Sequence, residues 1–125
     1  MLSRAALVAF VPVSDLTRAR RFFEETLGLS LGSADDYGCM YEINGATLRL
    51  SVVQEHTPAN YTIVGWTTDD IGATVRELAR RGVTFQRYEG LGQDADGIWT
   101  APSGDRVAWF RDPDGNVLSL TQIAS

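Results

Sequence analysis

The chain contains few side chains of the types that perform catalysis. Its sole histidine is His56, in the sequence Glu55-His56-Thr57-Pro58, and its sole cysteine is Cys39. A histidine-based triad has no other residue to draw on, and we interpret His56 as a solvated loop histidine, with a general base as the alternative. A single cysteine excludes an intrachain disulfide framework and a cysteine-rich zinc site. We expect Cys39 to be a small core residue in a strand.

Arg49 and Glu42 form the most informative polar pair of the sequence. The dipeptide Asn44-Gly45 is a strong signal for a two-residue hairpin, and a turn there pairs Met40 with Arg49 and Glu42 with Thr47. Glu42 then lies diagonally across from Arg49 on the same face of the sheet. Because a buried cation needs an anion nearby, we interpret the pair as an internal ion pair. The alternative is that Arg49 directly recognises a carboxylate, phosphate or enolate of a ligand. The two interpretations are compatible if Arg49 contacts both Glu42 and a ligand.

The other candidates for ligand contact are aromatic residues and one polar stretch. We interpret the glycine-containing stretch Tyr88–Ile98 as an acidic surface loop, with a loop that flanks a cleft and presents carboxylates to a cationic ligand as the alternative. Its polar residues are Glu89, Gln93, Asp94 and Asp96. Trp66 has the parity of a helix-facing core residue. The sequence does not fix which face Trp99, Trp109 and Phe110 occupy, and core packing is the commoner role of such residues.

Length and composition indicate one ordinary globular domain. The chain has 125 residues, 44% of them hydrophobic and 22% charged, which is enough apolar surface to bury a core. Eleven basic and sixteen acidic residues give a net charge of −5, which opposes binding to nucleic acids and to anionic membranes. No apolar run approaches the about 20 residues of a membrane span, and no signal peptide is recognised. We therefore expect a cytoplasmic protein.

The first half of the chain predicts a strand, a helix and three further strands. The segment Ala5–Val13 is apolar and rich in β-forming residues, Ser14 is a credible N-cap, and apolar residues follow at helical spacing over Leu16–Leu27. Gly28 can take the left-handed conformation that ends helices. The three strands are expected near Leu29–Ser33, Gly38–Ile43 and Ala46–Val53.

The second half repeats this order. It predicts a strand over Tyr61–Thr67, a cap at Thr68 and a helix from Ile71 to Gly82. Further strands are expected near Val83–Tyr88, Gly97–Ala101, Asp105–Arg111 and Asn116–Gln122. Matching residues lie 55 positions apart, namely Asp15 and Asp70, Leu16 and Ile71, and Val8 and Ile63. We infer an internal duplication in which each half is βαβββ, in the α+β class.

Two motifs make the doubled pattern resemble a known family. Val13-Ser14-Asp15-Leu16 precedes the first helix, and Asp112-Pro113-Asp114-Gly115-Asn116 precedes the last strand. In this order they resemble the vicinal-oxygen-chelate superfamily, which contains glyoxalases, bleomycin-resistance proteins and dioxygenases. The resemblance covers nearly the whole chain. It implies one domain over residues 1–125, with module one at residues 1–53, a linker at 54–60 and module two at 61–125. It also implies sheets that curl around a central cleft, and a homodimer.

The resemblance also implies where a catalytic metal would be bound. Metal-dependent members take one ligand from the first strand and one from the last strand of each module, which here are Val8, Arg49, Ile63 and Ser119. Val and Ile have no lone pair, Arg is a fixed cation, and a neutral hydroxyl is a poor sole ligand. We therefore expect neither a metal of the family type nor another cofactor, unless the register is shifted by one or two residues.

Strand alternation gives the rest of the expected cleft, because successive side chains point to opposite faces. Leu48, Leu50 and Val52 should pack on the helix, which turns their neighbours toward the cleft. The cleft-lining residues so predicted are Val8, Phe10, Met40, Glu42, Thr47, Arg49, Ser51, Ile63, Ser119 and Thr121. This mixture of apolar side chains, hydroxyls and one arginine suits a small organic ligand better than a metal.

The favoured function is metal-independent binding of a small molecule, with sequestration of a drug or metabolite as its purpose. The alternative is a lyase, isomerase or dioxygenase-type enzyme on the same scaffold, either metal-free with Arg49 and Glu42 as electrophile and base or with metal ligands not recognised above. A dimeric interaction module is the third hypothesis. The sequence leaves open the ligand, and whether the modules pair within a chain or across a dimer.

Overall fold

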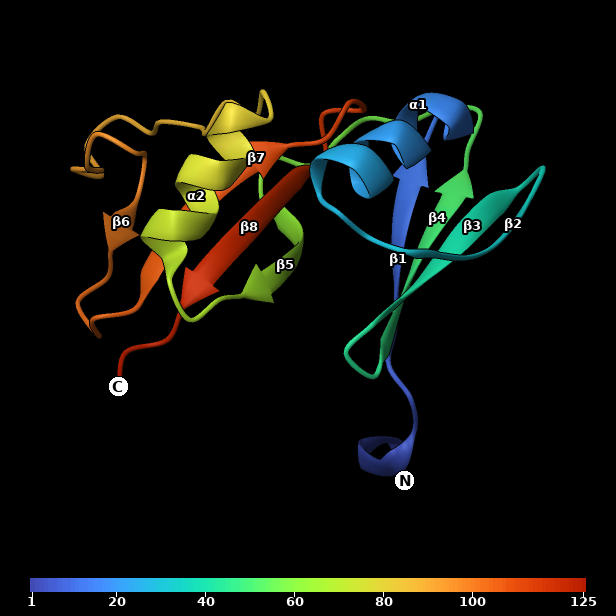
Figure 1. The fold of residues 1–125 in the computed structure, drawn as a ribbon, viewed down its shortest axis with the longest axis horizontal. Coiled ribbons are helices and arrows are strands. Elements are labelled where there is room, and N and C mark those ends of the chain that lie inside the picture. Colours follow the sequence, from blue (N-terminus) through green and yellow to red (C-terminus); the bar gives the residue numbers. More distant parts are fainter. The chain divides into compact units, whose positions relative to one another are not determined.

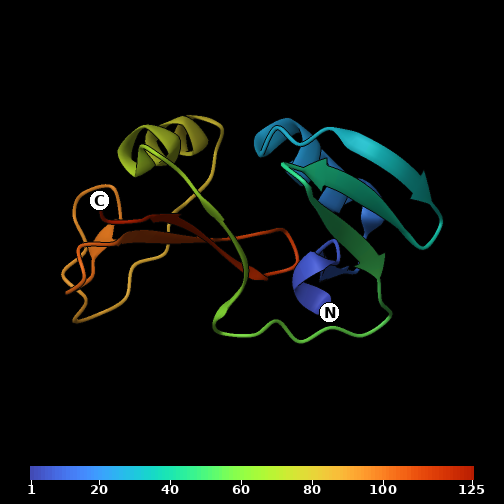
Figure 2. The same ribbon diagram turned by 90° about the horizontal axis from the view of Figure 1, so that it is seen from below.

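The computed structural model describes residues 1–125 and divides into two compact units. The N-terminal unit comprises Met1–Thr57 and the C-terminal unit Pro58–Ser125. Figures 1 and 2 show that each unit contains its own sheet, with a helix lying against one face of that sheet. Below, the face that carries the helix is called the helix face, and the opposite face is called the open face.

The N-terminal unit has a four-stranded mixed sheet in the order β1-β4-β3-β2. Its strands are β1 (Val8–Val13), β2 (Leu31–Asp35), β3 (Gly38–Ile43) and β4 (Ala46–Val52). β1 runs parallel to β4, and the other pairs are antiparallel. A short 3-10 helix, η1 (Leu2–Arg4), precedes β1, and α1 (Leu16–Arg21) continues directly into the π-helical turn η2 (Phe22–Thr26).

The C-terminal unit repeats this topology, with the strand order β5-β8-β7-β6. Its elements are β5 (Thr62–Thr67), α2 (Ile71–Arg80), β6 (Trp99–Thr100), β7 (Arg106–Arg111) and β8 (Val117–Gln122). β5 runs parallel to β8, as β1 does to β4. The α+β fold of two βαβββ halves is therefore confirmed. Neither helix is long and apolar enough to cross a membrane.

The two helices have equivalent N-caps, Asp15 and Asp70. These lie one and two residues beyond the caps predicted from the sequence. Asp15 Oδ1 accepts a hydrogen bond from Arg18 N at 3.1 Å, and Asp70 Oδ1 accepts one from Ala73 N at 3.0 Å. The predicted caps Ser14 and Thr68 are wrong, because these aspartates satisfy the free N–H groups of the first turn. Gly28 follows the first helical segment with φ of 79°, as predicted for left-handed termination, and Gly82 follows the second with φ of 96°.

The strand predicted at Val83–Tyr88 is wrong. Gln86 alone in this segment hydrogen-bonds to the sheet: its N donates to Trp109 O at 2.8 Å, and its Oε1 accepts from Arg111 Nε at 3.3 Å. The side chain of Gln93 takes up two further polar groups of the segment, since its Oε1 accepts from Tyr88 N and its Nε2 donates to Gln86 O. A side-chain amide thus takes the place of a strand partner, and β6 becomes the edge strand of the unit.

Burial follows the expected alternation of the strands in part. Leu48 and Leu50 are buried as predicted, but Val52, at the end of β4, is 38% exposed, so its predicted packing on the helix is wrong. In β8, Val117 and Ser119 on the open face are buried as well. In the N-terminal unit the helix face holds the core of fully buried residues around α1 and η2, which are Val11, Val13, Ala19, Phe23, Cys39, Tyr41, Leu48 and Leu50. In the C-terminal unit the equivalent residues are Ile71, Val75, Leu78, Ala108, Phe110, Leu118 and Leu120. Both open faces are consequently free of core packing against a helix, and their side chains are available for other roles.

Candidate functional site

An aromatic pocket lies on the open face of the C-terminal unit. It encloses about 480 Å³ and is lined by Asn60, Tyr61, Thr62, Tyr88, Leu91, Trp99, Trp109 and Val117. We call it the aromatic pocket. Trp109 and Val117 come from β7 and β8, Trp99 from the edge strand β6, and Tyr88 and Leu91 from the connection between α2 and β6. The volume is within the range of small-molecule sites, about 300–1,000 Å³.

Strand register explains why these tryptophans face the pocket. Trp99 pairs with Val107, and Trp109 pairs with Ser119, so all four side chains lie on the face opposite α2. Phe110, the next residue, pairs with Leu118 and is fully buried on the helix face. The phase that the sequence left open is therefore settled: Trp99 and Trp109 belong to the pocket, and Phe110 to the core. Trp66 pairs with Leu120, which confirms its helix-facing parity.

The aromatic rings form a floor and a wall. The Trp99 and Trp109 ring centroids lie 6.0 Å apart with an interplanar angle of 31°, which makes a nearly continuous floor. Tyr88 stands at 88° to Trp109 with its centroid 5.4 Å away. A planar molecule can stack on such a floor while its edge meets the wall, the two arrangements that aromatic quadrupoles favour. No carboxylate, imidazole or cation lines the pocket, so its polar contacts are restricted to hydroxyl and amide groups.

Gln93 holds the connection that supplies Tyr88 and Leu91. Besides its bonds to Tyr88 N at 2.6 Å and Gln86 O at 2.8 Å, its Nε2 donates to Gly97 O at 2.8 Å. Arg87 adds a second tie through the carbonyl oxygens of Gln93 and Asp94. One side chain therefore fixes both ends of the segment and places the wall of the pocket. Of the stretch interpreted as an acidic surface loop, Tyr88 and Leu91 line the pocket, whereas its carboxylates do not.

Seven of the predicted cleft residues lie together on the open face of the N-terminal unit. Cross-strand pairing joins Val8 to Thr47, Phe10 to Arg49 and Met40 to Arg49. Glu42 pairs with Thr47, and Ser51 with Gly38, as the hairpin at Asn44-Gly45 predicts. Val8 and Phe10 are 41% and 61% exposed, which leaves apolar surface uncovered beside the arginine. Whether this face binds a ligand stays a prediction.

The predicted ion pair between Glu42 and Arg49 is wrong. Glu42 Oε1 accepts a hydrogen bond from Thr47 Oγ1 at 2.7 Å, so its carboxylate is satisfied by the residue directly opposite. The ion pairs of the chain involve other arginines, and Arg49 is half-buried without an acceptor. A direct cross-strand neighbour has taken precedence over the diagonal one, because it is closer.

The three predicted cleft residues of the C-terminal unit occupy different environments. Thr121 pairs with Thr67 and is half-buried on the open face. Ser119 is buried under Gly65, where an added Cβ would lie 2.6 Å from Ser119 Oγ. Ile63 falls at an irregularity in the pairing of β5 with β8, between Thr62 and Val64. None of the three lines the aromatic pocket, although Thr62 and Val117 beside them do.

The residues at the positions equivalent to family metal ligands do not fit a divalent ion. Val8 and Ile63 provide no donor atom, Arg49 is a cation, and Ser119 is a buried hydroxyl. The bulge at Ile63 places Thr62 beside Val117, and a neutral hydroxyl there does not change the donor chemistry. The structure also contains no group of three His, Cys, Asp or Glu side chains arranged to hold a metal.

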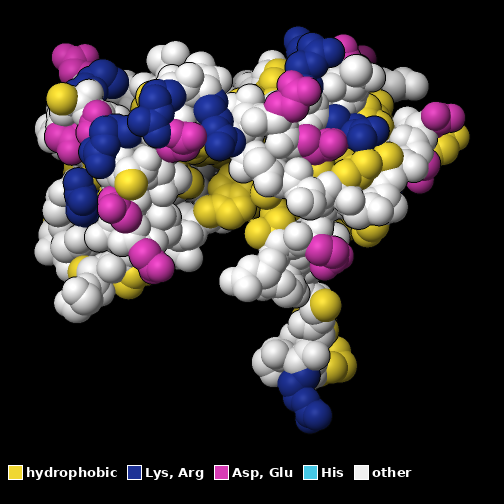
Figure 3. Space-filling view, in the orientation of Figure 1, with side chains coloured by type: hydrophobic (Ala, Val, Ile, Leu, Met, Phe, Trp, Pro, Cys, Tyr) yellow, Lys and Arg dark blue, Asp and Glu magenta, His cyan; other side chains and the backbone are white.

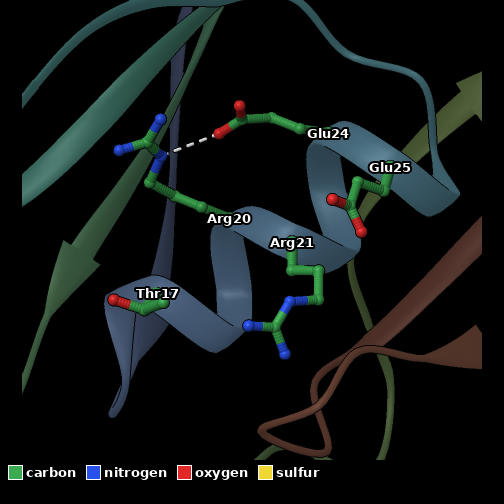
Figure 4. Close-up of a pocket in the computed structure, with 5 residues that line it drawn as sticks. All are labelled: Thr17, Arg20, Arg21, Glu24 and Glu25. Atoms are coloured by element: carbon green, nitrogen blue, oxygen red, sulfur yellow. Dashed lines mark hydrogen bonds and ion pairs between the residues drawn. The ribbon is translucent and has the colours of Figure 1, made fainter.

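A second concavity, of about 230 Å³, lies on α1 and η2 and is lined by Thr17, Arg20, Arg21, Glu24 and Glu25 (Figure 4). Arg20 Nε donates to Glu24 Oε2 at 2.8 Å, and Tyr41 Oη donates to the same oxygen at 3.0 Å. The hydrogen bond from Arg20 lowers the pKa of Glu24, whereas burial raises the pKa of Tyr41. Two of the four charged side chains of this concavity, Arg20 and Glu24, are thus paired at a spacing of four residues, as on a stabilised helix surface.

The surface of α2 is of the same kind. Figure 3 shows cationic and acidic side chains interleaved over the C-terminal unit, and Glu77 is paired with Arg80 and Arg81. These pairs lower the pKa of Glu77 through the hydrogen bond from Arg80. Both helix surfaces are therefore best explained by local charge pairing, which leaves the aromatic pocket as the best candidate for the functional site.

Sequence reasoning named Trp99 and Trp109 but did not place them in a site. The two tryptophans could have been placed by extending the side-chain alternation from the last strand to its neighbours. Ser119 was expected on the cleft face, Trp109 pairs with Ser119, and Trp99 pairs with Val107 on the same face. No local pattern assigns Leu91 to the same place, because it comes from a connection without strand alternation. Tyr61 is expected in a strand, but β5 begins one residue later, at Thr62.

The comparisons with known proteins agree on one family. The family model described as Glyoxalase/Bleomycin resistance protein/Dioxygenase superfamily matches residues 5–120. TnmS3, an antibiotic binding protein from Streptomyces sp. CB03234, is 27% identical with a TM-score of 0.70, over 99% of both chains. No curated protein matches the sequence.

Two further solved structures share the fold. Lactoylglutathione lyase from Agrobacterium tumefaciens is 19% identical with a TM-score of 0.71, over 95% of this chain and 93% of that chain. A glyoxalase/bleomycin resistance protein/dioxygenase from Alicyclobacillus acidocaldarius is 18% identical with a TM-score of 0.69, over 98% of this chain and 93% of that one. At these identities the likeness concerns the fold alone.

Proposed function

Because this chain belongs to the glyoxalase/bleomycin resistance protein/dioxygenase superfamily, we propose that it is a small-molecule-binding protein that acts without a metal ion. Its ligand is a planar or amphipathic organic compound, held in the aromatic pocket. The role is sequestration, in which the ligand is bound and released without chemical change.

The observation that carries this proposal is the floor of Trp99 and Trp109 with the wall of Tyr88. Aromatic floors recognise flat rings through stacking and burial of apolar area. The pocket offers neither a general base nor an electrophile, since its polar groups are confined to Asn60, Thr62 and tyrosine hydroxyls. It can therefore bind an organic molecule but supplies little for its conversion.

Two further observations support the proposal. The side chains at the positions equivalent to metal ligands are aliphatic, cationic and hydroxylic, so they do not provide the ligands of a family metal centre. The chain also resembles an antibiotic binding protein over 99% of both chains at 27% identity. The metal-free form of the enzyme alternative depends on Glu42 as a base, and that carboxylate is exposed and bonded to Thr47.

We also propose that the protein is a cytoplasmic homodimer. The buried free thiol of Cys39 suits a reducing compartment, and a homodimer is the assembly that the family resemblance implies. Sedimentation equilibrium would report twice the chain mass of 13.7 kDa, and a single-chain mass at all concentrations would contradict the dimer.

The test of binding uses the tryptophans themselves as probes. A panel of planar polycyclic natural products is titrated against the full chain while tryptophan fluorescence and melting temperature are followed. We expect quenching and a raised melting temperature with some members, and an affinity about 30-fold lower for Trp109→Ala, the loss usual for an aromatic hot spot. Trp66→Phe is the matched control, because Trp66 lies on the helix face and its replacement should leave the affinity unchanged.

Each negative outcome has a definite meaning. If no compound changes either signal, or if Trp66→Phe weakens binding as much as Trp109→Ala, the aromatic pocket is not the ligand site. Mass spectrometry of the recovered ligand separates binding from catalysis, since a changed mass would favour the enzyme alternative. Elemental analysis after reconstitution with Ni, Zn, Mn and Fe would show one ion per site if the protein were a metalloprotein.

A further inference from the structure

Arg111 is the last residue of β7 and borders the aromatic pocket. It lies two residues beyond Trp109, so both side chains are on the open face of the sheet. Its cross-strand partner is Val117, and Val117 pairs on its other side with Thr62 of β5. Val117 and Thr62 both line the pocket. A row across the open face therefore runs from Arg111 through Val117 to Thr62, and it places a cation beside a pocket whose lining residues are all neutral.

The hydrogen bonds of Arg111 leave its charge without a carboxylate. Its Nη1 donates to Gly115 O at 2.6 Å, and its Nε donates to Gln86 Oε1 at 3.3 Å. Both acceptors are neutral oxygens, and the guanidinium forms no ion pair. Nη2 has no acceptor in the protein, although the side chain is half-buried. The guanidinium can therefore donate further hydrogen bonds to a bound molecule, and an oxyanion is the strongest acceptor for them.

The same contacts hold the guanidinium in place beside the pocket. Gln86, which accepts from Arg111 Nε, donates through its own N to Trp109 O at 2.8 Å, and its O accepts from Gln93 Nε2 at 2.8 Å. Arg111 is thus tied through Gln86 to the strand that carries Trp109 and to the side chain that places Tyr88. A cation that is already fixed loses little conformational freedom when an anion binds.

We propose that Arg111 is a specificity-determining residue of the aromatic pocket, which selects planar ligands that carry an acidic oxygen, such as a carboxylate or a phenolate. The aromatic part of the ligand stacks on Trp99 and Trp109, and its oxyanion accepts from Nη2 of Arg111 next to Val117. This inference rests on the proposed function, because it takes the aromatic pocket as the ligand site, and it narrows the ligand to an aromatic acid.

The acidic residues of the chain do not oppose this selection at short range. The net charge of −5 repels anions only weakly at a distance, because physiological salt screens exposed charges beyond about 8 Å. The carboxylates of the connection between α2 and β6 do not line the pocket. Two of them lie near arginines of their own, with Asp94 3.8 Å from Arg106 and Asp96 3.6 Å from Arg76. Arg111 is therefore the charge that an acid bound in the pocket meets first.

The test compares two planar probes of the same shape. Anthracene-2-carboxylate carries an oxyanion, and anthracene-2-carboxamide is its neutral counterpart. Both are titrated at neutral pH against the full chain while tryptophan fluorescence is followed. We expect the carboxylate to bind about 10-fold more tightly, the effect of one hydrogen bond to a charged group. Arg111→Gln should abolish this preference by weakening the carboxylate alone. Arg111→Lys keeps the charge without the fork, so it should retain part of the preference, and it provides a second variant if Arg111→Gln fails to fold.

Two controls separate this selection from general effects. Arg106→Gln removes the other arginine of β7, which has the parity of the helix-facing residues of that strand, and should change neither affinity. Trp109→Ala should weaken both probes and leave the ratio of their affinities intact. Equal affinity of the unsubstituted protein for the two probes, or an equal loss of both in Arg111→Gln, would overturn the inference and leave the aromatic pocket as the ligand site. Binding of neither probe would contradict the proposed function and this inference with it.

Discussion

The N-terminal and C-terminal units are built on the same scaffold but present different open faces. Both have the strand order first-last-third-second, a helix that begins at an aspartate cap, and a core of aliphatic and aromatic residues against that helix. The N-terminal open face carries Arg49 between exposed apolar residues. The C-terminal open face carries the aromatic pocket. The helix face is thus the part that the duplication keeps, and the open face is the part that differs.

The connection between helix and edge strand accounts for much of that difference. In the N-terminal unit, residues 27–30 are sufficient to lead from η2 to β2. In the C-terminal unit, residues 81–98 intervene between α2 and β6, and they contribute Tyr88 and Leu91 to the pocket. A lengthened surface connection can acquire a binding role at little cost to the core, because closing a longer loop adds only a small entropic penalty.

The largest expected effect tests the shared helix face. Leu48 and Leu118 occupy the equivalent position in the last strands of the two units and are 3% and 0% exposed. Each truncation to alanine should lower the free energy of unfolding by about 3 kcal/mol through lost burial and a residual cavity. Urea denaturation measures both variants, with the surface variant Thr17→Ala as control. A loss confined to one unit would mean that the two cores are not equivalent.

The turn before the last strand is the next point of contrast. In the C-terminal unit Asp112 is buried and accepts from Asp114 N and Asn116 N, while its Oδ2 accepts from Asn116 Nδ2. Asp112→Ala should therefore lower the free energy of unfolding by about 2–3 kcal/mol, since buried donors lose their acceptor. In the N-terminal unit the turn is only Asn44-Gly45, with φ of 48° and 87°.

The matched variant Asn44→Ala should lower the free energy of unfolding by about 1 kcal/mol, because alanine tolerates positive φ less well than asparagine. Gly45→Ala, in the same turn, serves as a second measure of that strain. Equal losses for Asp112→Ala and Asn44→Ala would contradict the view that only the C-terminal turn is held by buried polar contacts.

Elements held by interactions between residues close in sequence were predicted well, and elements held by residues distant in sequence were not. β3 was predicted at its observed bounds, Gly38–Ile43, because alternation and the Asn44-Gly45 turn act within neighbouring residues. The strand predicted at Val83–Tyr88 failed because Gln93, a residue outside the segment, takes up its polar groups. The aromatic pocket escaped prediction for the same reason: its parts come from separate segments that only tertiary structure brings together.

The third prediction concerns Gln93, which holds the connection between α2 and β6 in the C-terminal unit. Gln93→Ala removes its bonds to Tyr88 N, Gln86 O and Gly97 O and so releases the wall of the pocket. We expect an approximately 10-fold loss of affinity for a planar ligand of the pocket, from poorer preorganisation, and a fall of about 1–2 kcal/mol in unfolding free energy. Fluorescence titration and urea denaturation measure the two quantities.

The control for Gln93 lies in the same connection. Glu89→Ala changes an exposed residue next to Tyr88 that does not line the pocket, and should alter neither affinity nor stability. If Gln93→Ala destabilised the protein without weakening the planar ligand, the connection would be a structural strap and not a part of the binding site.

The smallest expected effect concerns two carboxyl groups, one in each unit, whose pKa values are shifted in opposite directions. The hydrogen bond from Arg20 lowers the pKa of Glu24 from its ordinary 4.5, so the ionised form stabilises the N-terminal unit above that pH and the contribution is lost as pH falls through the lowered value. Burial raises the pKa of Asp112 from 3.8, so its contribution is fully present below that pH and is lost as pH rises through the raised value.

Substitution by the neutral amide should therefore change the pH dependence of stability in opposite directions. Glu24→Gln should lower the free energy of unfolding at neutral pH by less than about 1 kcal/mol, because the pair is partly exposed, and the deficit should disappear in acid. For Asp112→Asn the deficit relative to the unsubstituted protein should instead grow as pH falls below the raised pKa. Urea denaturation across pH 3 to 8 measures both differences. Parallel pH profiles for the two variants would contradict the inference that a charged partner sets the pKa of Glu24 and burial sets the pKa of Asp112.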